Sequence, residues 1–226
     1  MIRKNLSHLK ELIAAKCLSA GREVDSVTLI AVSKLFGTDH MREAISAGQI
    51  HFGENYAQEF RDKFAVFSEE NLVWHYIGTL QTNKVKYVTG NADYIHSIDS
   101  VKILAEIQKQ AEKKGIIQKV FLEFKSSFET TKSGGGIEEV FTLAAESTGM
   151  KNIEVAGVMT MAPFVDDITI IRDAFRRTRL LVEELQRSGY SGIKELSMGM
   201  TGDYLTAIEE GATFLRIGTA IFGERN

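Results

Sequence analysis

The feature that most constrains the fold of this sequence is the alternation of short apolar runs with helical patterns. The runs are continuous in apolar or β-branched residues, which is typical of strands that are covered on both faces. They lie at residues 28–33, 50–52, 73–77, 94–97, 119–124, 155–159, 194–197 and 214–217. Eight strands with helices between them predict a (β/α)8 barrel, that is, a TIM barrel of the α/β class. A doubly wound open sheet is the alternative, and the count of eight favours the barrel.

Helical patterns separate the predicted strands. Apolar residues recur every three or four positions in residues 168–185 and in residues 103–111, which indicates helices with one buried face. A further helix is expected at about residues 5–20, before the first strand. Its apolar face consists of Leu6, Leu9, Ile13 and Cys17. No linker or change in composition marks a second domain, so we expect residues 1–226 to form a single barrel with an extra N-terminal helix.

Composition and charge exclude several classes of partner. With 226 residues, 44% of them hydrophobic and 25% charged, the chain can bury a full core. Its formal net charge of −3 and its pI near 6.0 give no electrostatic footprint for nucleic acid or an anionic membrane. No apolar run approaches the roughly 18 residues that a membrane span needs, and the single cysteine excludes a disulfide framework or a cysteine-based metal site. We therefore expect a cytoplasmic protein with no metal, nucleic-acid or membrane partner.

Polar residues stand at the ends of many predicted strands, where the functional site of such a barrel is assembled. They are Lys34, Glu54, Asn55, His75, Lys125, Thr160, Ser197 and Arg216. Lys34 has the same parity as Ile30 and Val32. If those two residues face the barrel interior, the amine of Lys34 points up the barrel axis.

A lysine at that place has a chemical use. Desolvation disfavours the charged form of a lysine, and the neutral amine can form an imine with an aldehyde. The alternative is a lysine whose amine reaches solvent at the rim of the barrel. Lys34 alone does not decide between these interpretations.

Two glycine-containing loops follow the last two predicted strands, at residues 197–203 and 216–219. Barrels often bind phosphate with these two loops, because glycines allow close approach and backbone N–H groups and hydroxyls donate to the anion. The alternative is that the glycines only make tight turns. A lysine facing a phosphate site favours a ligand with both an aldehyde and a phosphate, which is pyridoxal 5′-phosphate (PLP) or a sugar phosphate.

Arg216 helps to choose between these ligands. A guanidinium group has only donors, so it would keep a facing pyridine nitrogen unprotonated and weaken the ring as an electron sink. The alternative for Arg216 is a salt bridge with a carboxylate at a strand end.

Several segments together resemble one protein family. They are residues 31–34, 52–56, 74–78, 80–84, 132–134, 157–163, 196–200 and 216–223. The chain resembles, over nearly its whole length, the pyridoxal phosphate homeostasis proteins, which share the barrel of alanine racemase. The resemblance implies that Lys34 carries PLP as an internal aldimine, a Schiff base, and that Arg216 faces the pyridine nitrogen. It also implies that Ser197, Gly218 and Thr219 hold the phosphate. The implied cofactor-binding residues are Lys34, Asn55, His75, Ser197, Gly199, Arg216, Gly218 and Thr219.

The sequence departs from the family pattern at several positions. Residues 35–37, Leu-Phe-Gly, stand where the family commonly has Thr-Lys-Pro, and Lys125 stands where it usually has asparagine. The run at 133–136 is richer in glycine than usual. Lys132 matches a family lysine, although a solvated loop charge is the alternative for it.

The resemblance implies a monomeric protein that stores PLP or delivers it to apo-enzymes, without evident catalytic activity. A PLP-dependent amino-acid racemase is one alternative, but it needs an acid or base on each face of the substrate carbon. In alanine racemase the second group comes from a further domain, whereas this sequence ends at Asn226, just after the eighth strand. A Schiff-base aldolase acting on a sugar phosphate is the other alternative, and it gives Arg216 no role.

Overall fold

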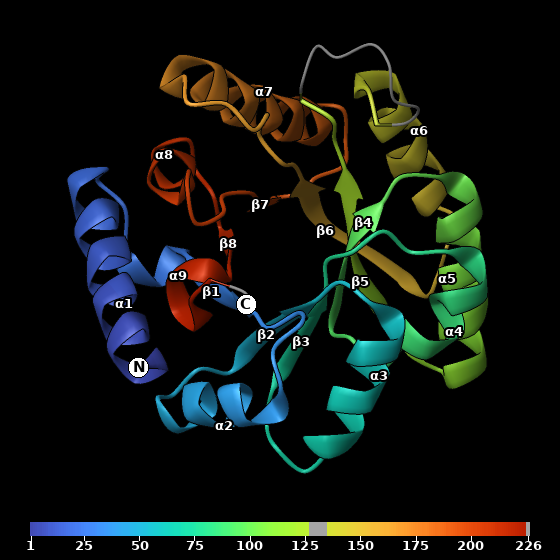
Figure 1. The fold of residues 1–226 in the computed structure, drawn as a ribbon. Helices are drawn as coiled ribbons and strands as arrows, with labels where there is room; N and C mark the ends of the chain where they lie inside the picture. The colour runs from blue at the N-terminus through green and yellow to red at the C-terminus, as the bar shows by residue number, and fades with distance from the viewer. Residues whose placement is uncertain (127–134, 225–226) are drawn as a thin grey trace.

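The structure is a computed structural model that describes residues 1–126 and 135–224. In this part of the chain, parallel strands pair in sequence order and the last pairs with the first, so that the sheet closes into a barrel (Figure 1). The strands are β1 (Thr28–Val32), β2 (His51–Glu54), β3 (Val73–Tyr76), β4 (Tyr94–Ile98), β5 (Gln118–Glu123), β6 (Ile153–Met159), β7 (Glu195–Ser197) and β8 (Phe214–Ile217). The predicted (β/α)8 barrel is confirmed, and pairing of β1 with β8 excludes an open sheet.

Helices surround the barrel (Figure 1). The α-helices are α1 (Ile2–Ser19), α2 (Thr38–Ser46), α3 (Ala57–Val66), α4 (Val85–Val88), α5 (Val101–Lys114), α6 (Ile137–Ser147), α7 (Ile168–Arg187), α8 (Tyr204–Glu209) and α9 (Thr219–Phe222). Short 3₁₀ turns are η1 (Val24–Ser26) and η2 (Thr82–Lys84). No helix in the described part of the chain is both long and apolar enough to cross a membrane.

The predicted N-terminal helix is confirmed as α1. It buries the predicted face of Leu6, Leu9, Ile13 and Cys17, and it contacts α2, α8 and α9. It begins earlier than expected because Ile2 continues the same apolar face and is also buried. The extra helix thus covers the outside of the barrel where the first and last strands meet.

The direction of the side chains in β1 and β8 decides which residues can reach the barrel interior. Ile30 is buried in an interior cluster that includes Phe121 and Phe214, whereas Ala31 belongs to the core between strands and helices. Ile30 is also the register partner of Arg216 in β8. Ile30 therefore faces the barrel interior, and because side chains alternate along a strand, this meets the condition on which the direction of Lys34 depends.

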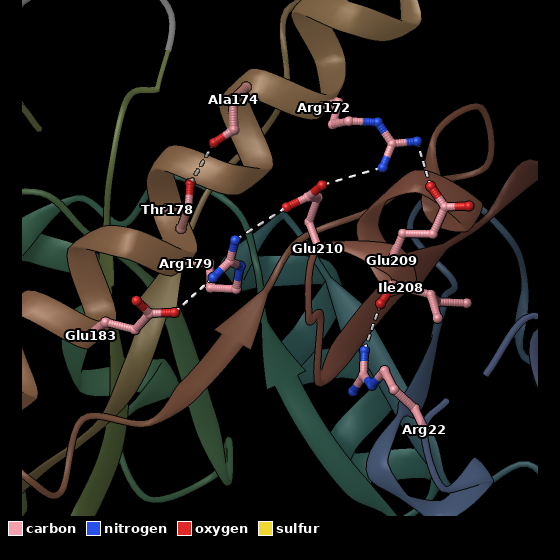
Figure 2. A network of polar contacts seen from close by, with 9 residues as sticks. All are labelled: Arg22, Arg172, Ala174, Thr178, Arg179, Glu183, Ile208, Glu209 and Glu210. Atoms are coloured by element: carbon pink, nitrogen blue, oxygen red, sulfur yellow. Dashed lines mark hydrogen bonds and ion pairs between the residues drawn. The ribbon is translucent and has the colours of Figure 1, made fainter. Parts of the chain in front are cut away.

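A network of ion pairs connects α7 with α8 (Figure 2). Glu210 pairs with Arg172 at 3.2 Å and with Arg179 at 3.6 Å, and Arg172 also pairs with Glu209. From the other side, Arg22 donates a hydrogen bond of 2.8 Å to the carbonyl of Ile208. These contacts fix α8, and α8 carries the loop that follows β7.

Candidate functional site

A pocket of about 400 Å³ opens at the carboxyl ends of the barrel strands. Among its lining residues are five that the sequence analysis predicted, namely Lys34, Asn55, Arg216, Gly218 and Thr219. The volume lies within the range of small-molecule and cofactor sites, and the position is the one that (β/α)8 barrels use for function. The structure therefore brings the predicted amine, guanidinium and glycine-hydroxyl loop into one cavity.

The backbone on both sides of Lys34 is held by side chains of α3. The ammonium of Lys63 donates a hydrogen bond of 2.7 Å to the carbonyl of Ser33, and it pairs with Glu59 at 2.7 Å. Glu59 in turn accepts a hydrogen bond of 2.6 Å from the N–H of Leu35. Leu35 has a φ of 65°, in the left-handed region that a residue with a side chain rarely adopts. This clamp fixes the chain immediately before and after the lysine.

The buried carboxylate of Glu54 completes the clamp. It accepts a hydrogen bond of 2.6 Å from the hydroxyl of Ser33 and pairs with Lys63 at 2.7 Å. Burial raises the pKa of Glu54, and the charge of Lys63 opposes this rise. Pairing the lysine with the carboxylate offsets part of the cost of burying either charge alone, although Oε2 of Glu54 has no hydrogen-bond partner within the described residues. The position of Glu54 at a strand end was predicted from the sequence, whereas its pairing with α3 appears only in the structure.

Asn55 presents an unsatisfied acceptor at the pocket. Its Oδ1 atom is buried and has no hydrogen-bond partner within the described residues. The backbone of Asn55 lies so close to Gly78 that a Cβ there would be 2.1 Å from its carbonyl oxygen, so glycine is required for this arrangement. Because buried polar atoms are normally paired, Asn55 fits a ligand that brings a hydrogen-bond donor, such as a ring hydroxyl.

Arg216 lies at the floor of the pocket and is buried. It donates hydrogen bonds to the hydroxyl of Ser197, at 2.6 Å, and to the carbonyl of Thr160, at 2.8 Å. Burial lowers the pKa of Arg216 to about 10, and the carboxylates of Asp203 and Glu123 oppose this fall. The guanidinium therefore remains a cation at neutral pH. Both of these acceptors are neutral oxygens, and an arginine has five N–H donors, which leaves donors for a ligand in the pocket.

Different structural constraints require glycine at Gly218 and at Gly199 in the two loops. A Cβ on Gly218 would lie 3.2 Å from the carbonyl oxygen of Val32, so this loop lies close against the end of β1. Thr219 follows it at the pocket mouth. Gly199 has a φ of 95°, and a Cβ there would lie 2.7 Å from that of Ala207 in α8. The structure thus gives Gly199 a packing role, whereas Gly218 and Thr219 line the pocket.

Two predicted site residues, Ser197 and His75, lie beneath the pocket inside the barrel, where both are fully buried. The hydroxyl of Ser197 contacts Nδ1 of His96 at 2.8 Å, and Nε2 of His96 contacts Nδ1 of His75 at 2.9 Å. Nε2 of His75 contacts Nδ1 of His51 at 3.0 Å. His51 and His96 were not among the predicted site residues. For His51 the available signal was its parity, because His51 has the same parity as Asn55 along the second strand and its end.

The departures from the family pattern fall in different surroundings. Phe36 stacks on Phe222 with ring centroids 5.0 Å apart, so it packs the first loop against α9. The backbone N–H of Lys125 donates to the carbonyl of Gly135 at 2.8 Å. Lys132, with residues 133–134 of the glycine-rich run, lies outside the described residues. Within the described residues, no group of histidine, cysteine and acidic side chains could hold a metal ion.

Comparisons with known proteins agree with this geometry. The family model described as "Alanine racemase, N-terminal domain" matches residues 3–226. The pyridoxal phosphate homeostasis protein of Aquifex aeolicus is 41% identical over 98% of this chain and 97% of its own length. The protein of the same name from Escherichia coli K12 is 35% identical over all of this chain and 97% of its own length.

Solved structures show the same fold. PipY of Synechococcus elongatus PCC7942, solved with PLP bound, has a TM-score of 0.86 and 31% identity, covering 99% of this chain and 100% of its own. Alanine racemase of Streptomyces lavendulae is 17% identical with a TM-score of 0.71; the match covers 99% of this chain and 57% of the longer enzyme, and it shows a shared fold. The chain therefore belongs to the alanine racemase N-terminal domain family, and within it to the pyridoxal phosphate homeostasis proteins.

Proposed function

We propose that this protein binds PLP in the pocket at the barrel mouth and takes part in PLP homeostasis, as a binding protein rather than an enzyme. The observation that carries the proposal is the convergence of Lys34, Asn55, Arg216 and the Gly218–Thr219 loop on one cavity. Each of these groups matches a different part of PLP. The bound cofactor of the relative PipY supports the same assignment.

Each of these residues would bind a different part of the cofactor. The amine of Lys34 would bond covalently to the aldehyde, and the hydroxyl of Thr219 with nearby backbone N–H groups would hold the phosphate. Asn55 would accept from the ring hydroxyl, and Arg216 would donate to the pyridine nitrogen. PLP itself supplies the electrophilic aldehyde and the electron-withdrawing ring.

Arg216 supports a binding role over catalysis. A donor-only guanidinium facing the pyridine nitrogen keeps it unprotonated, so the ring accepts less negative charge from a substrate carbon. We further propose that the protein is a monomer of the cytoplasm that passes PLP to apo-enzymes. Size-exclusion chromatography tests the oligomeric state, and cofactor transfer from the loaded protein to a PLP-free aminotransferase tests the delivery.

Borohydride reduction of the PLP-loaded protein, followed by peptide mapping, tests the covalent assignment. We expect the reduced cofactor on Lys34. The variant Lys34→Ala should lose covalent attachment while keeping a wild-type circular dichroism spectrum. Lys125→Ala is the matched control, because it removes another strand-end amine and should leave attachment intact. Label on Lys125 with Lys34 unlabelled would refute the proposal.

A further inference from the structure

A continuous chain of hydrogen-bonding side chains passes through the barrel from the floor of the pocket toward the opposite end. It runs from Arg216 to Ser197 (2.6 Å), to His96 (2.8 Å), to His75 (2.9 Å) and to His51 (3.0 Å). Five residues from strands β2, β3, β4, β7 and β8 thus form one connected series. A binding role for Lys34 and its neighbours does not require such a series.

Aromatic rings fix the two inner histidines in place. The ring of His75 stacks on Tyr94, with centroids 4.9 Å apart and an interplanar angle of 5°. The ring of His96 stacks on Phe121 at 4.3 Å and 14°. Burial lowers the pKa of both histidines well below the usual value, so each is neutral and has one donor and one acceptor nitrogen.

Arg216 sets the direction of the chain. A guanidinium only donates, so the Ser197 oxygen accepts from Arg216, and the Ser197 hydroxyl can then donate to Nδ1 of His96. It follows that His96 carries its proton on Nε2 and donates to His75, which likewise donates from Nε2 to His51. In the opposite direction Ser197 would accept twice, and its own hydrogen would have no acceptor among the contacts of the described residues.

The outer end of the chain reaches a second pocket, of about 420 Å³, at the amino ends of the strands. His51 lines this pocket together with Asp93 and Lys119. Burial lowers the pKa of His51, and the charge of Asp93 opposes this fall. The chain therefore spans the interior between two cavities, with Arg216 at one and His51 at the other.

We propose that His96 is a positioning residue for the cofactor, because it accepts from the Ser197 hydroxyl and, through it, holds the guanidinium of Arg216 in one orientation. His75 holds the ring of His96 through its contact with Nε2. His51 terminates this chain at the second pocket and accepts its last hydrogen bond. The link to the cofactor rests on the proposed function, whereas the direction of the chain is a property of the protein without ligand.

The direction can be measured on the ligand-free protein by ¹⁵N–¹H NMR of histidine labelled with ¹⁵N in the ring. We expect neutral rings at His75 and His96, each with its proton on Nε2. A proton on Nδ1 of either ring, or a cationic ring at neutral pH, would overturn the proposed direction. This measurement needs no variant and no PLP.

Cofactor binding tests the positioning role. His96→Leu removes the acceptor of the Ser197 hydroxyl, and we expect it to weaken PLP binding about tenfold. His96→Asn offers an acceptor near the place of Nδ1 and should restore most of the affinity. Tyr94→Phe is the control, because it keeps the ring stacked on His75 and every nitrogen of the chain. We expect it to bind PLP like the wild type.

Wild-type affinity in His96→Leu would refute the positioning role. A spectrum of bound PLP that shifts in His96→Leu and returns in His96→Asn would support it, because a purely structural defect would not change the ring environment in this way. If the wild-type protein bound no PLP, the proposed function would fail, and the NMR measurement would still decide whether the oriented chain exists.

Discussion

The carboxylate of Glu59 accepts a hydrogen bond from the backbone N–H of Leu35 at 2.6 Å. This bond joins α3 to the first residue after Lys34, in a left-handed conformation that costs roughly 1–3 kcal/mol when a side chain is present. On the other side of Lys34, the ammonium of Lys63 donates a hydrogen bond to the carbonyl of Ser33. The position of the lysine in the pocket is thus set by Glu59 and Lys63, which do not themselves line the pocket.

We predict that Lys63→Met destabilises the protein by about 3–5 kcal/mol, because it leaves the buried carboxylate of Glu54 without its partner. Urea unfolding measures this loss. Lys109→Met is the control, since Lys109 pairs with Glu106 at the surface, where such a pair contributes at most about 1 kcal/mol. Equal losses in the two variants would contradict a structural role for the clamp.

Phosphate binding can be assigned by comparing PLP with pyridoxal. We predict that Thr219→Val weakens PLP binding by about 1.5–3 kcal/mol more than pyridoxal binding, because a charge-assisted hydrogen bond to phosphate is lost. Ser197→Ala should weaken both ligands alike, since the Ser197 hydroxyl bonds to Arg216 and His96. Equilibrium titration with both ligands gives the answer. A selective loss of PLP in Ser197→Ala would assign the phosphate to Ser197 instead.

Stability should fall in mild acid. Because burial lowers the pKa of His75 and His96 in the folded protein, the unfolded chain takes up protons below about pH 6.5 that the folded chain does not. The free energy of unfolding is therefore fully retained above that pH and decreases below it, by up to about 1.4 kcal/mol per pH unit for each histidine.

Denaturant unfolding between about pH 7 and pH 5 measures this slope. His75→Gln should reduce it, whereas His8→Gln, which changes an exposed histidine of α1, should leave it unchanged. An identical slope in the wild type and His75→Gln would show that His75 is not the source.

The loaded protein should be a poor racemase. Because Arg216 remains a cation and donates to its neighbours, it should keep the pyridine nitrogen unprotonated and limit proton loss from a bound amino acid. We predict racemisation far slower than about 1 s⁻¹, the low end of ordinary enzymes. Incubation with single L-amino acids in deuterated water, with D-enantiomer measured over hours, tests this. Turnover near the enzymatic rate would contradict a binding role.

The sequence by itself determined the fold and those residues of the site that line the pocket at the barrel mouth. Eight apolar runs predicted eight strands with ends correct to within about two residues, because burial on both faces requires continuous apolar composition. The parity of Lys34 with Ile30 linked the directions of the two side chains, since alternation along a strand is local, and the structure places Ile30 in the interior. The strand-end position of Arg216 and the glycine-containing loop at 216–219 pointed to Arg216, Gly218 and Thr219, which all line the pocket.

Only the tertiary structure decided how deeper polar residues combine. His96 and Ser197 are 101 positions apart, and they meet only because the barrel brings β4 and β7 to a common axis. Lys63 is a charged residue of a surface helix, where such side chains are usually solvated, yet the packing of α3 buries it against Glu54. Hydrogen-bond partners across a closed barrel depend on register and on the height of each residue along the axis, which local sequence patterns do not specify.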